Sequence, residues 1–105
     1  MAATTEGKIK KRIKDILDLQ NVYYFMPSTN GYGRSGVVDI VACVNGNFLG
    51  IEAKSGNKQP TALQHREMDL INKAGGFALC INEYNIDALN TYINLLKLQD
   101  NKNAP

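Results

Sequence analysis

Two acidic residues interrupt segments of the sequence that are otherwise apolar. Asp39 lies inside the run 37–44, and Glu52 lies near the end of the run 47–54. The dipeptide Asn45-Gly46 joins the two runs and is the strongest short-range signal for a β-hairpin. If the turn has two residues, counting outward from it places Asp39 directly opposite Glu52.

Opposed residues on neighbouring strands have Cβ atoms about 4.5–5.5 Å apart. In the same register Val44 pairs with Asn47. Two carboxylates so close repel each other, and placing them among apolar residues is costly. A divalent cation between Asp39 and Glu52 would offset both costs, and oxygen ligands favour Mg²⁺ or Mn²⁺ over zinc.

A lysine follows on the same strand. Lys54 lies two residues after Glu52, so both side chains leave the same face of the sheet. Its ammonium can offset the carboxylates, orient a water and stabilise charge that develops on a phosphate. Alternatively, Asp39, Glu52 and Lys54 form a salt-bridged sheet edge. That reading explains the Glu–Lys pair but not an aspartate within an apolar run.

The elements that must position these residues alternate between helical and strand patterns. Thr4 or Thr5 can cap a first helix, in which Glu6 falls on the apolar side of the helical wheel. Pro60 suits the first turn of a middle helix, and Asn85 can cap the last one. The predicted order is helix, three strands, helix, strand and helix, at 4–20, 22–26, 37–44, 47–54, 60–74, 77–82 and from 85 to about 99. This order predicts an α/β fold in which a mixed four-stranded sheet is flanked by helices.

Length and composition limit the class of protein. The chain has 105 residues, 44% of them hydrophobic and 21% charged, which fits one globular domain over 1–105 with a frayed tail at about 100–105. Wholesale disorder, collagen and a coiled-coil rod are excluded. There is no apolar run of about 20 residues and no apolar N-terminal signal, so we expect a cytoplasmic protein without membrane contact. A net charge of +2 does not by itself predict a nucleic-acid partner.

The two cysteines, Cys43 and Cys80, lie in the apolar runs IVACV and FALCI. We expect both to be small buried strand residues rather than a disulfide, as suits a reducing compartment. Their spacing does not match a zinc site.

The segments Gly36-Val37-Val38-Asp39 and Ile51-Glu52-Ala53-Lys54 together resemble the core motif of the PD-(D/E)XK nucleases. In detail they are similar to the VRR-NUC branch, which includes small stand-alone phage and bacterial proteins. The resemblance covers nearly the whole chain and implies a restriction-endonuclease-like core. One position departs from the motif, because Val38 stands where the family has a proline that shapes the backbone.

The resemblance implies a site and a reaction. Its catalytic residues would be Glu6, Asp39, Glu52, Lys54 and Gln64. Asp39, Glu52 and the backbone carbonyl of Ala53 would hold Mg²⁺ or Mn²⁺, and Glu6 would bind the metal through water or help to hold a second ion. The implied activity is endonucleolytic cleavage of branched DNA, with a homodimer resolving a four-way (Holliday) junction. For Gln64 an exposed helix glutamine, and for Glu6 a partner of the helix dipole, are the plainer alternatives.

Residues outside the motif suggest where DNA would bind. Five cations lie within residues 8–14, which is typical of a solvated helix face or of phosphate contact. Residues 31–36 spell G-x-G-x-x-G, but a strand follows instead of the helix that a dinucleotide site needs, so no dinucleotide is expected. This loop either only connects two elements or meets DNA phosphates. The candidate DNA contacts are Lys8, Lys11, Arg12, Arg34, Ser35, Lys58 and Arg66.

Three other functions remain open at this stage. The same site could serve a nicking or flap nuclease acting on another DNA structure. A non-catalytic DNA-binding module could retain the fold, but binding alone does not need two opposed carboxylates. A protein-interaction domain is the third alternative, and its binding would be insensitive to salt.

Overall fold

The computed structural model describes residues 5–28 and 33–99. These residues form α1 (Thr5–Leu19), β1 (Tyr23–Phe25), β2 (Ile40–Val44), β3 (Asn47–Ala53), α2 (Ala62–Lys73), β4 (Phe77–Ile81) and α3 (Asp87–Leu98). The predicted order of elements and the predicted α/β class are both confirmed. The tail predicted to fray at about 100–105 lies outside the described residues, as do residues 31 and 32 of the glycine-rich loop.

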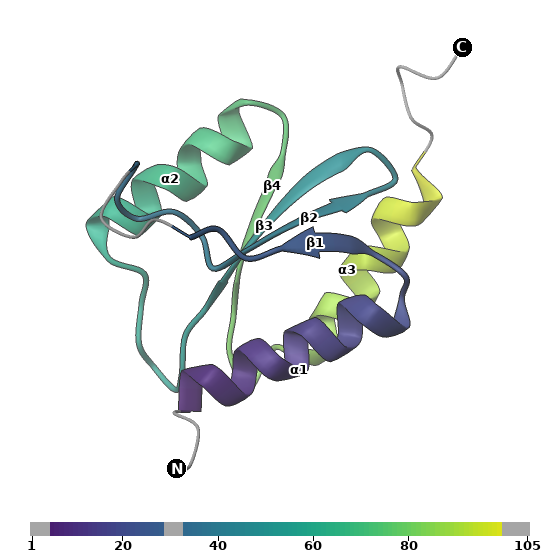
Figure 1. Ribbon diagram of the computed structural model, residues 1–105, viewed down its shortest axis with the longest axis horizontal. Helices are drawn as coiled ribbons and strands as arrows, with labels where there is room; N and C mark the ends of the chain where they lie inside the picture. Colours follow the sequence, from purple (N-terminus) through teal and green to yellow (C-terminus); the bar gives the residue numbers. More distant parts are fainter. Residues whose placement is uncertain (1–4, 29–32, 100–105) are drawn as a thin grey trace.

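The described strands form one sheet in the order β1-β2-β3-β4. β2 runs antiparallel to both β1 and β3, whereas β3 and β4 run parallel, so the sheet is mixed. The parallel pair requires a crossover, which α2 supplies. Figure 1 shows α1 and α3 on one side of the sheet and α2 on the other.

The hydrophobic core lies between the sheet and the pair α1 and α3. Residues at helical spacing on α1, namely Ile9, Ile13 and Leu17, meet alternate residues of β2 and β3 there. The helix α3 contributes another buried row. The buried residues of the sheet and of α3 in this core include Ile40, Ala42, Val44, Leu49, Ile51, Ala53, Leu89, Ile93 and Leu96.

The other face of the sheet is only partly covered. α2 packs against β3 and β4, and its one buried side chain is the charged Glu67. Among the described residues no helix lies over the β1–β2 half of this face. Cys43 is exposed there, so the prediction that both cysteines are buried is wrong for Cys43 and only partly right for the half-buried Cys80; both are free thiols. The reason is that Cys43 points away from the core face that its neighbours Ala42 and Val44 fill.

Two predicted helix starts are also wrong. α2 begins at Ala62 with Thr61 as its N-cap, so Pro60 precedes the cap and does not lie in the first turn. α3 has Ile86 at its N-cap and no side-chain capping hydrogen bond. Asn85 instead accepts a hydrogen bond from the backbone N–H of Asn82 and donates one to the carbonyl of Cys80. It thereby shapes the turn after β4 and not the start of the helix.

Every helix in residues 5–28 and 33–99 is too short or too polar to cross a membrane.

Candidate active site

The hairpin between β2 and β3 places the two acidic residues together. Asn45 and Gly46 both have positive φ, at 52° and 80°, as a two-residue type I′ turn requires. Val44 pairs with Asn47, and the ladder continues to Ile40 opposite Ile51. The predicted register is therefore confirmed over the whole of β2.

Asp39 directly precedes β2, one step beyond the last pair of the ladder. Its Oδ2 accepts a hydrogen bond from the backbone N–H of Ala53 at 2.9 Å. The carboxylate thus replaces a backbone partner at the point where the ladder ends, which fixes it against the neighbouring strand. The structure brings Asp39 and Glu52 to the same end of the hairpin, as the turn predicted.

Glu52 is the most deeply buried charged residue among those described, with 1% of its surface exposed. Its Oε1 accepts a hydrogen bond from Nε2 of Gln64 at 2.9 Å and lies 4.0 Å from Nζ of Lys54. Its Oε2 is buried and has no hydrogen-bond partner among the described residues. A buried carboxylate oxygen without a donor is uncommon because it loses the hydrogen bonds of water without replacement.

The surroundings of Glu52 oppose its negative charge. Burial is the largest cause, followed by the charge of Asp39 and the hydrogen bond that Glu52 would donate to Asp39 when protonated; together they raise the pKa of Glu52 to about 8. Lys54 and Lys10 act in the opposite direction. A divalent cation beside Glu52 would favour the ionised carboxylate and so oppose the raised pKa.

Lys54 lies immediately beyond β3, and its backbone N–H donates to the carbonyl of Ile81 at 3.0 Å. This bond continues the parallel pairing of β3 with β4 and fixes the backbone of the lysine. Its side chain is 13% exposed. The ammonium therefore lies in a nearly closed environment beside Glu52, as the two-residue spacing predicted.

Gln64 reaches Glu52 because of how α2 starts. Thr61 and Gln64 form a capping box: the Thr61 hydroxyl accepts from the Gln64 N–H at 3.2 Å, and Gln64 Oε1 accepts from the Thr61 N–H at 2.8 Å. With its oxygen held in this way, the Gln64 amide must direct its nitrogen toward Glu52. The prediction missed Thr61, although the pattern Thr-x-x-Gln after Pro60 is a capping-box signal.

Gly36 is a second residue that the sequence reasoning left without a role. Its φ is +79°, and a Cβ at this position would lie 2.5 Å from the backbone carbonyl carbon and oxygen of Leu63 and 2.9 Å from the Gln64 N–H nitrogen. The turn before Asp39 thus packs directly on the first turn of α2. This contact sets the distance between Asp39 and Gln64.

A third missed residue is Lys10, on α1. Its Nζ lies 3.5 Å from Oδ1 of Asp39, and its side chain is 33% exposed. A helical wheel contains the signal: at ~100° per residue, Lys10 falls next to Leu17 at the margin of the apolar stripe. The five cations of residues 8–14 therefore differ in their surroundings: Lys8, Lys11 and Arg12 are exposed, Lys14 is half-buried, and Lys10 lies beside Asp39.

Glu6 lies beside Lys58, with Oε2 of Glu6 and Nζ of Lys58 4.0 Å apart. No three acidic, histidine or cysteine side chains within the described ranges gather closely enough to hold a metal ion. The close pair is therefore Asp39 and Glu52, and further ligands would have to be backbone carbonyls or water. The donor set that remains is made of oxygen, which fits Mg²⁺ or Mn²⁺.

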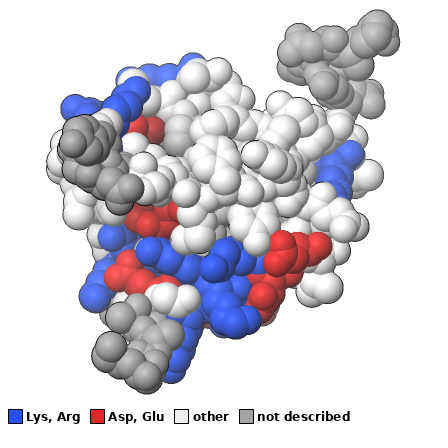
Figure 2. Space-filling view, viewed as in Figure 1, with Lys and Arg blue, Asp and Glu red and all other residues white. Residues whose placement is uncertain are grey.

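The predicted DNA contacts fall into two groups. Lys8, Lys11 and Arg12 are exposed on α1, and Figure 2 shows basic side chains gathered over this helix. Arg34 instead donates to Oε2 of Glu67 at 2.7 Å, and Arg66 lies 3.9 Å from the same oxygen. Ser35 is exposed in the turn that follows Arg34.

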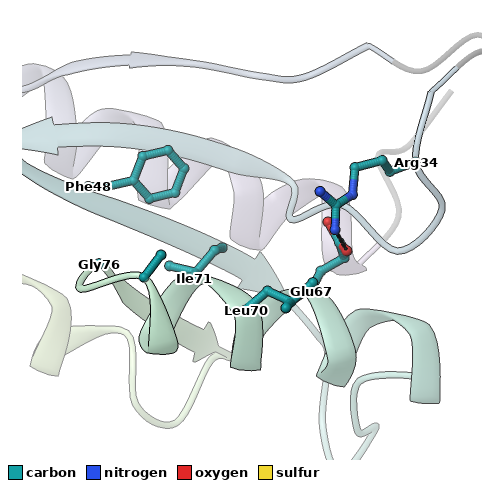
Figure 3. Close-up of a pocket in the computed structure, with 7 residues that line it drawn as sticks. Arg34, Phe48, Glu67, Leu70, Ile71 and Gly76 are labelled. Atoms are coloured by element: carbon teal, nitrogen blue, oxygen red, sulfur yellow. Dashed lines mark hydrogen bonds and ion pairs between the residues drawn. The ribbon is translucent and has the colours of Figure 1, made fainter.

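The ion pair of Arg34 and Glu67 closes one end of a pocket of about 410 Å³. Figure 3 shows the two side chains pointing toward each other, with Phe48 from β3 and Leu70 and Ile71 from α2 along the pocket. This pocket does not include Asp39, Glu52 or Lys54. It is therefore separate from the candidate active site.

Comparisons with known proteins agree with this geometry. One solved structure, described as "VRR_NUC domain", superposes with a TM-score of 0.76 at 26% sequence identity, covering 86% of this chain and 98% of that chain. This match supports membership of the VRR-NUC family. A second structure, "VRR_NUC domain protein", has a TM-score of 0.69 at 19% identity, over 95% of this chain and 94% of that one. No family sequence model and no curated protein matches the sequence.

The two matches support a nuclease-type domain and confirm the resemblance carried by the two motif segments. Val38, which replaces the family's motif proline, is buried and lies beside Gly50 of the neighbouring strand. The VRR-NUC fold therefore forms here without that proline, and its place is filled by an apolar side chain.

Proposed function

We propose that this VRR-NUC protein is a divalent-metal-dependent endonuclease that hydrolyses phosphodiester bonds in branched DNA, acting as a homodimer on four-way junctions. The observation that carries the proposal is the buried Oε2 of Glu52, to which no residue in the described ranges donates; Glu52 lies at the end of the hairpin beside Asp39. A merely structural glutamate would be expected to have both oxygens paired.

Asp39, Glu52 and the carbonyl of Ala53 would hold Mg²⁺ or Mn²⁺, and Glu6 would contribute through water. When bound, such an ion lowers the pKa of a water ligand and offsets the negative charge of a phosphate in the transition state. The pairing of Asp39 with the Ala53 N–H leaves Oδ1 of Asp39 on the side away from that bond. Each carboxylate would therefore offer one oxygen: Oε2 of Glu52, and Oδ1 of Asp39, which lies 3.5 Å from Nζ of Lys10.

The chain's own residues have distinct tasks in this proposal. Lys54 orients the attacking water and stabilises negative charge on the phosphate, because its ammonium lies beside Glu52 in a nearly closed environment. Gln64 holds Oε1 of Glu52 through its amide nitrogen. The backbone of β3 keeps Glu52 and Lys54 on one face of the sheet.

DNA would approach over α1. Lys8, Lys11 and Arg12 present their charges to solvent there, and Lys58 lies beside Glu6 at the start of the same helix. Cations of this kind bind phosphates and orient the duplex without reading its sequence. Arg34 and Arg66 have Glu67 as a partner, so they and Ser35 have a secondary part in the proposal.

The homodimer is proposed from the substrate, because resolving a junction symmetrically requires two cuts and each chain has one site. The partly covered sheet face supports it. Exposed apolar residues gather on that face at the edge of β1 and along β2 and β3, and Figure 2 shows a surface with few charges over these strands. They include Tyr23, Phe25, Cys43 and Phe48.

Cleavage of a labelled four-way junction beside linear duplex of the same sequence tests the activity. We expect paired symmetric nicks in Mg²⁺ or Mn²⁺, none in EDTA, and none with Asp39→Ala or Lys54→Ala. Binding without cleavage in every metal would overturn the enzyme. Cleavage of flaps or nicked duplex but not of junctions would overturn the substrate alone.

Light scattering tests the homodimer. The wild type is expected at twice 11.6 kDa, and Phe48→Glu is expected to shift it toward the monomer. Tyr84→Glu is the matched control, because Tyr84 is also exposed but precedes α3 on another part of the surface. A wild type that is monomeric with and without DNA would contradict symmetric junction resolution.

A further inference from the structure

The candidate active site contains two anions and two cations. Asp39 and Glu52 supply the carboxylates, and Lys10 and Lys54 supply the ammonium groups. With both carboxylates ionised, as metal binding requires, the charges of the four side chains cancel. A divalent cation entering the same site would add two positive charges beside the two ammonium groups, and this repulsion favours the outward movement of one of the lysines.

The two lysines are held differently. Lys54 follows directly from β3, its backbone is bonded to Ile81, and its side chain is 13% exposed. Lys10 belongs to α1 and reaches Asp39 at the end of the sheet with its side chain alone. That side chain is 33% exposed. The Lys10 side chain is long and flexible, so its ammonium can move toward solvent without any change in the backbone.

Asp39 does not depend on Lys10 for its position. The hydrogen bond from the Ala53 N–H to Oδ2 fixes the carboxylate, and the ammonium of Lys10 lies 3.5 Å from the other oxygen, Oδ1. Removal of the ammonium therefore leaves a correctly placed anion. An ammonium and a divalent cation at the same oxygen would repel strongly in this partly closed site.

We propose that Lys10 is an internal counter-ion that competes with the divalent cation for Oδ1 of Asp39. The inference rests on the proposed metal site and adds a residue that sets its affinity. Without metal, Lys10 offsets the repulsion between Asp39 and Glu52 and stabilises the fold. When metal binds, the ammonium leaves Asp39, and this displacement weakens the apparent affinity.

Mn²⁺ titration by calorimetry, in the absence of DNA, tests the competition. Lys10→Met, which keeps an unbranched apolar stem, is expected to bind Mn²⁺ about tenfold more tightly than the wild type. Lys10→Arg keeps the charge and is expected to bind within about threefold of the wild type. Lys11→Met is the matched control: Lys11 lies on the same helix and pairs with Asp15 at 3.2 Å, so its loss should change the affinity less than twofold.

Thermal unfolding provides a second measurement, because the unfolding temperature can be compared both without metal and with metal bound. In EDTA, Lys10→Met is expected to unfold at a lower temperature than the wild type and Lys11→Met, because Asp39 and Glu52 lose an opposing charge. At saturating Mn²⁺ the difference is expected to close or reverse. Equal or weaker Mn²⁺ binding by Lys10→Met, with wild-type stability in EDTA, would overturn the proposed role of Lys10.

Asp39→Asn separates this failure from failure of the proposed function. If the wild type binds Mn²⁺ and Asp39→Asn does not, the metal site stands whatever Lys10 does. If neither the wild type nor Lys10→Met binds Mn²⁺, the metal site and the competition both fall.

Discussion

Two buried glutamates, Glu52 and Glu67, show opposite solutions to the same physical problem. Glu67 is 8% exposed, and one of its oxygens accepts a hydrogen bond from Arg34 at 2.7 Å with Arg66 nearby. Glu52 is 1% exposed, lies 4.0 Å from its nearest cation Lys54, and leaves Oε2 without a donor. Glu67 is held in an ion pair, whereas Glu52 keeps a carboxyl oxygen at the end of the sheet that no described residue pairs.

The difference shows why burial of a charge is not by itself a sign of function. Arg34 offsets the cost of burying Glu67, so that site has no need of a ligand. The pKa of Glu52 is raised mainly by burial and then by Asp39, which means that the local cations do not offset the cost. The part of the molecule that is electrostatically incomplete is the part for which we propose chemistry.

Replacement of each glutamate by glutamine gives the largest contrast. Glu52→Gln is expected to lower junction cleavage by about a thousandfold or more, because a metal-binding oxygen is lost. Its stability in EDTA should equal or exceed that of the wild type, since a buried charge next to Asp39 is removed. Glu67→Gln should cost about 1–3 kcal/mol of stability and leave cleavage within a few-fold of the wild type.

Cleavage rates and urea unfolding measure both effects, and circular dichroism checks the fold of each variant. If Glu67→Gln is fully folded and still loses as much cleavage activity as Glu52→Gln, the proposed difference between the two glutamates is wrong.

The pH dependence of stability should distinguish the two glutamates. Because the folded pKa of Glu52 is raised from about 4.5 to about 8, the unfolded chain releases this proton at a lower pH than the native protein. The free energy of unfolding in EDTA should therefore fall by about 3–5 kcal/mol as the pH rises from about 5 to 8, and level off above that.

Urea titrations at several pH values measure this slope. Glu52→Gln should lack most of it, whereas Glu67→Gln should retain it. Parallel slopes for the wild type and Glu52→Gln would show that Glu52 is not the group responsible.

Gly36 packs on the first turn of α2, the helix that carries the Glu52 partner Gln64 and also Glu67. A Cβ there would meet the Leu63 backbone at 2.5 Å, so Gly36→Ala should displace the first turn of α2, which carries Gln64 and, one turn later, Glu67. The expected cost is about 3 kcal/mol, with loss of cleavage in the remaining folded protein. Gly33→Ala is the control, because Gly33 also has positive φ but no atom lies within 4 Å of its Cβ position; it should cost about 1 kcal/mol. Thermal unfolding of both variants decides whether the close contact or the φ angle matters.

The smallest expected effect concerns the cysteine beside Glu52. Cys80 pairs in register with Glu52, and burial followed by the charge of Glu52 raises the pKa of its thiol, whereas Cys43 is exposed on β2. Iodoacetamide at pH 8 should therefore modify Cys43 at least about tenfold faster than Cys80. Glu52→Gln should accelerate the Cys80 reaction, and Glu67→Gln should not. Mass spectrometry of timed samples measures both rates, with urea-unfolded protein as the reference for equal reactivity.

Much of the site was predictable because its positions follow from local rules. The Asn45-Gly46 turn determines the register of β2 and β3, so Asp39, Glu52 and Lys54 could be brought together by counting residues. The apolar spacing of Ile9, Ile13 and Leu17 likewise predicted which face of α1 meets the core. The assignment of catalytic roles to these residues stays a prediction.

What the sequence could not supply depends on partners that are distant along the chain. The sequence offered Arg34 as a DNA contact, which stays a prediction, but gave no sign of its ion pair with Glu67, 33 residues away. The apolar segment around Cys43 predicted a buried side chain. Cys43 is exposed because no helix in the described residues covers the part of the sheet face on which it lies. Charge runs and apolar runs are local properties, whereas pairing and exposure depend on which elements pack together.

The sequence by itself therefore determined the hairpin, the order of elements and the motif that lies at the end of β3, because turns and periodicity act over a few residues. Only the tertiary structure decided that Lys10 from α1 faces Asp39, that the Thr61 cap aims Gln64 at Glu52, and that Oε2 of Glu52 stays unpaired. Each of these contacts joins elements through a balance of burial and charge that exists only once α1, α2 and the sheet have packed together.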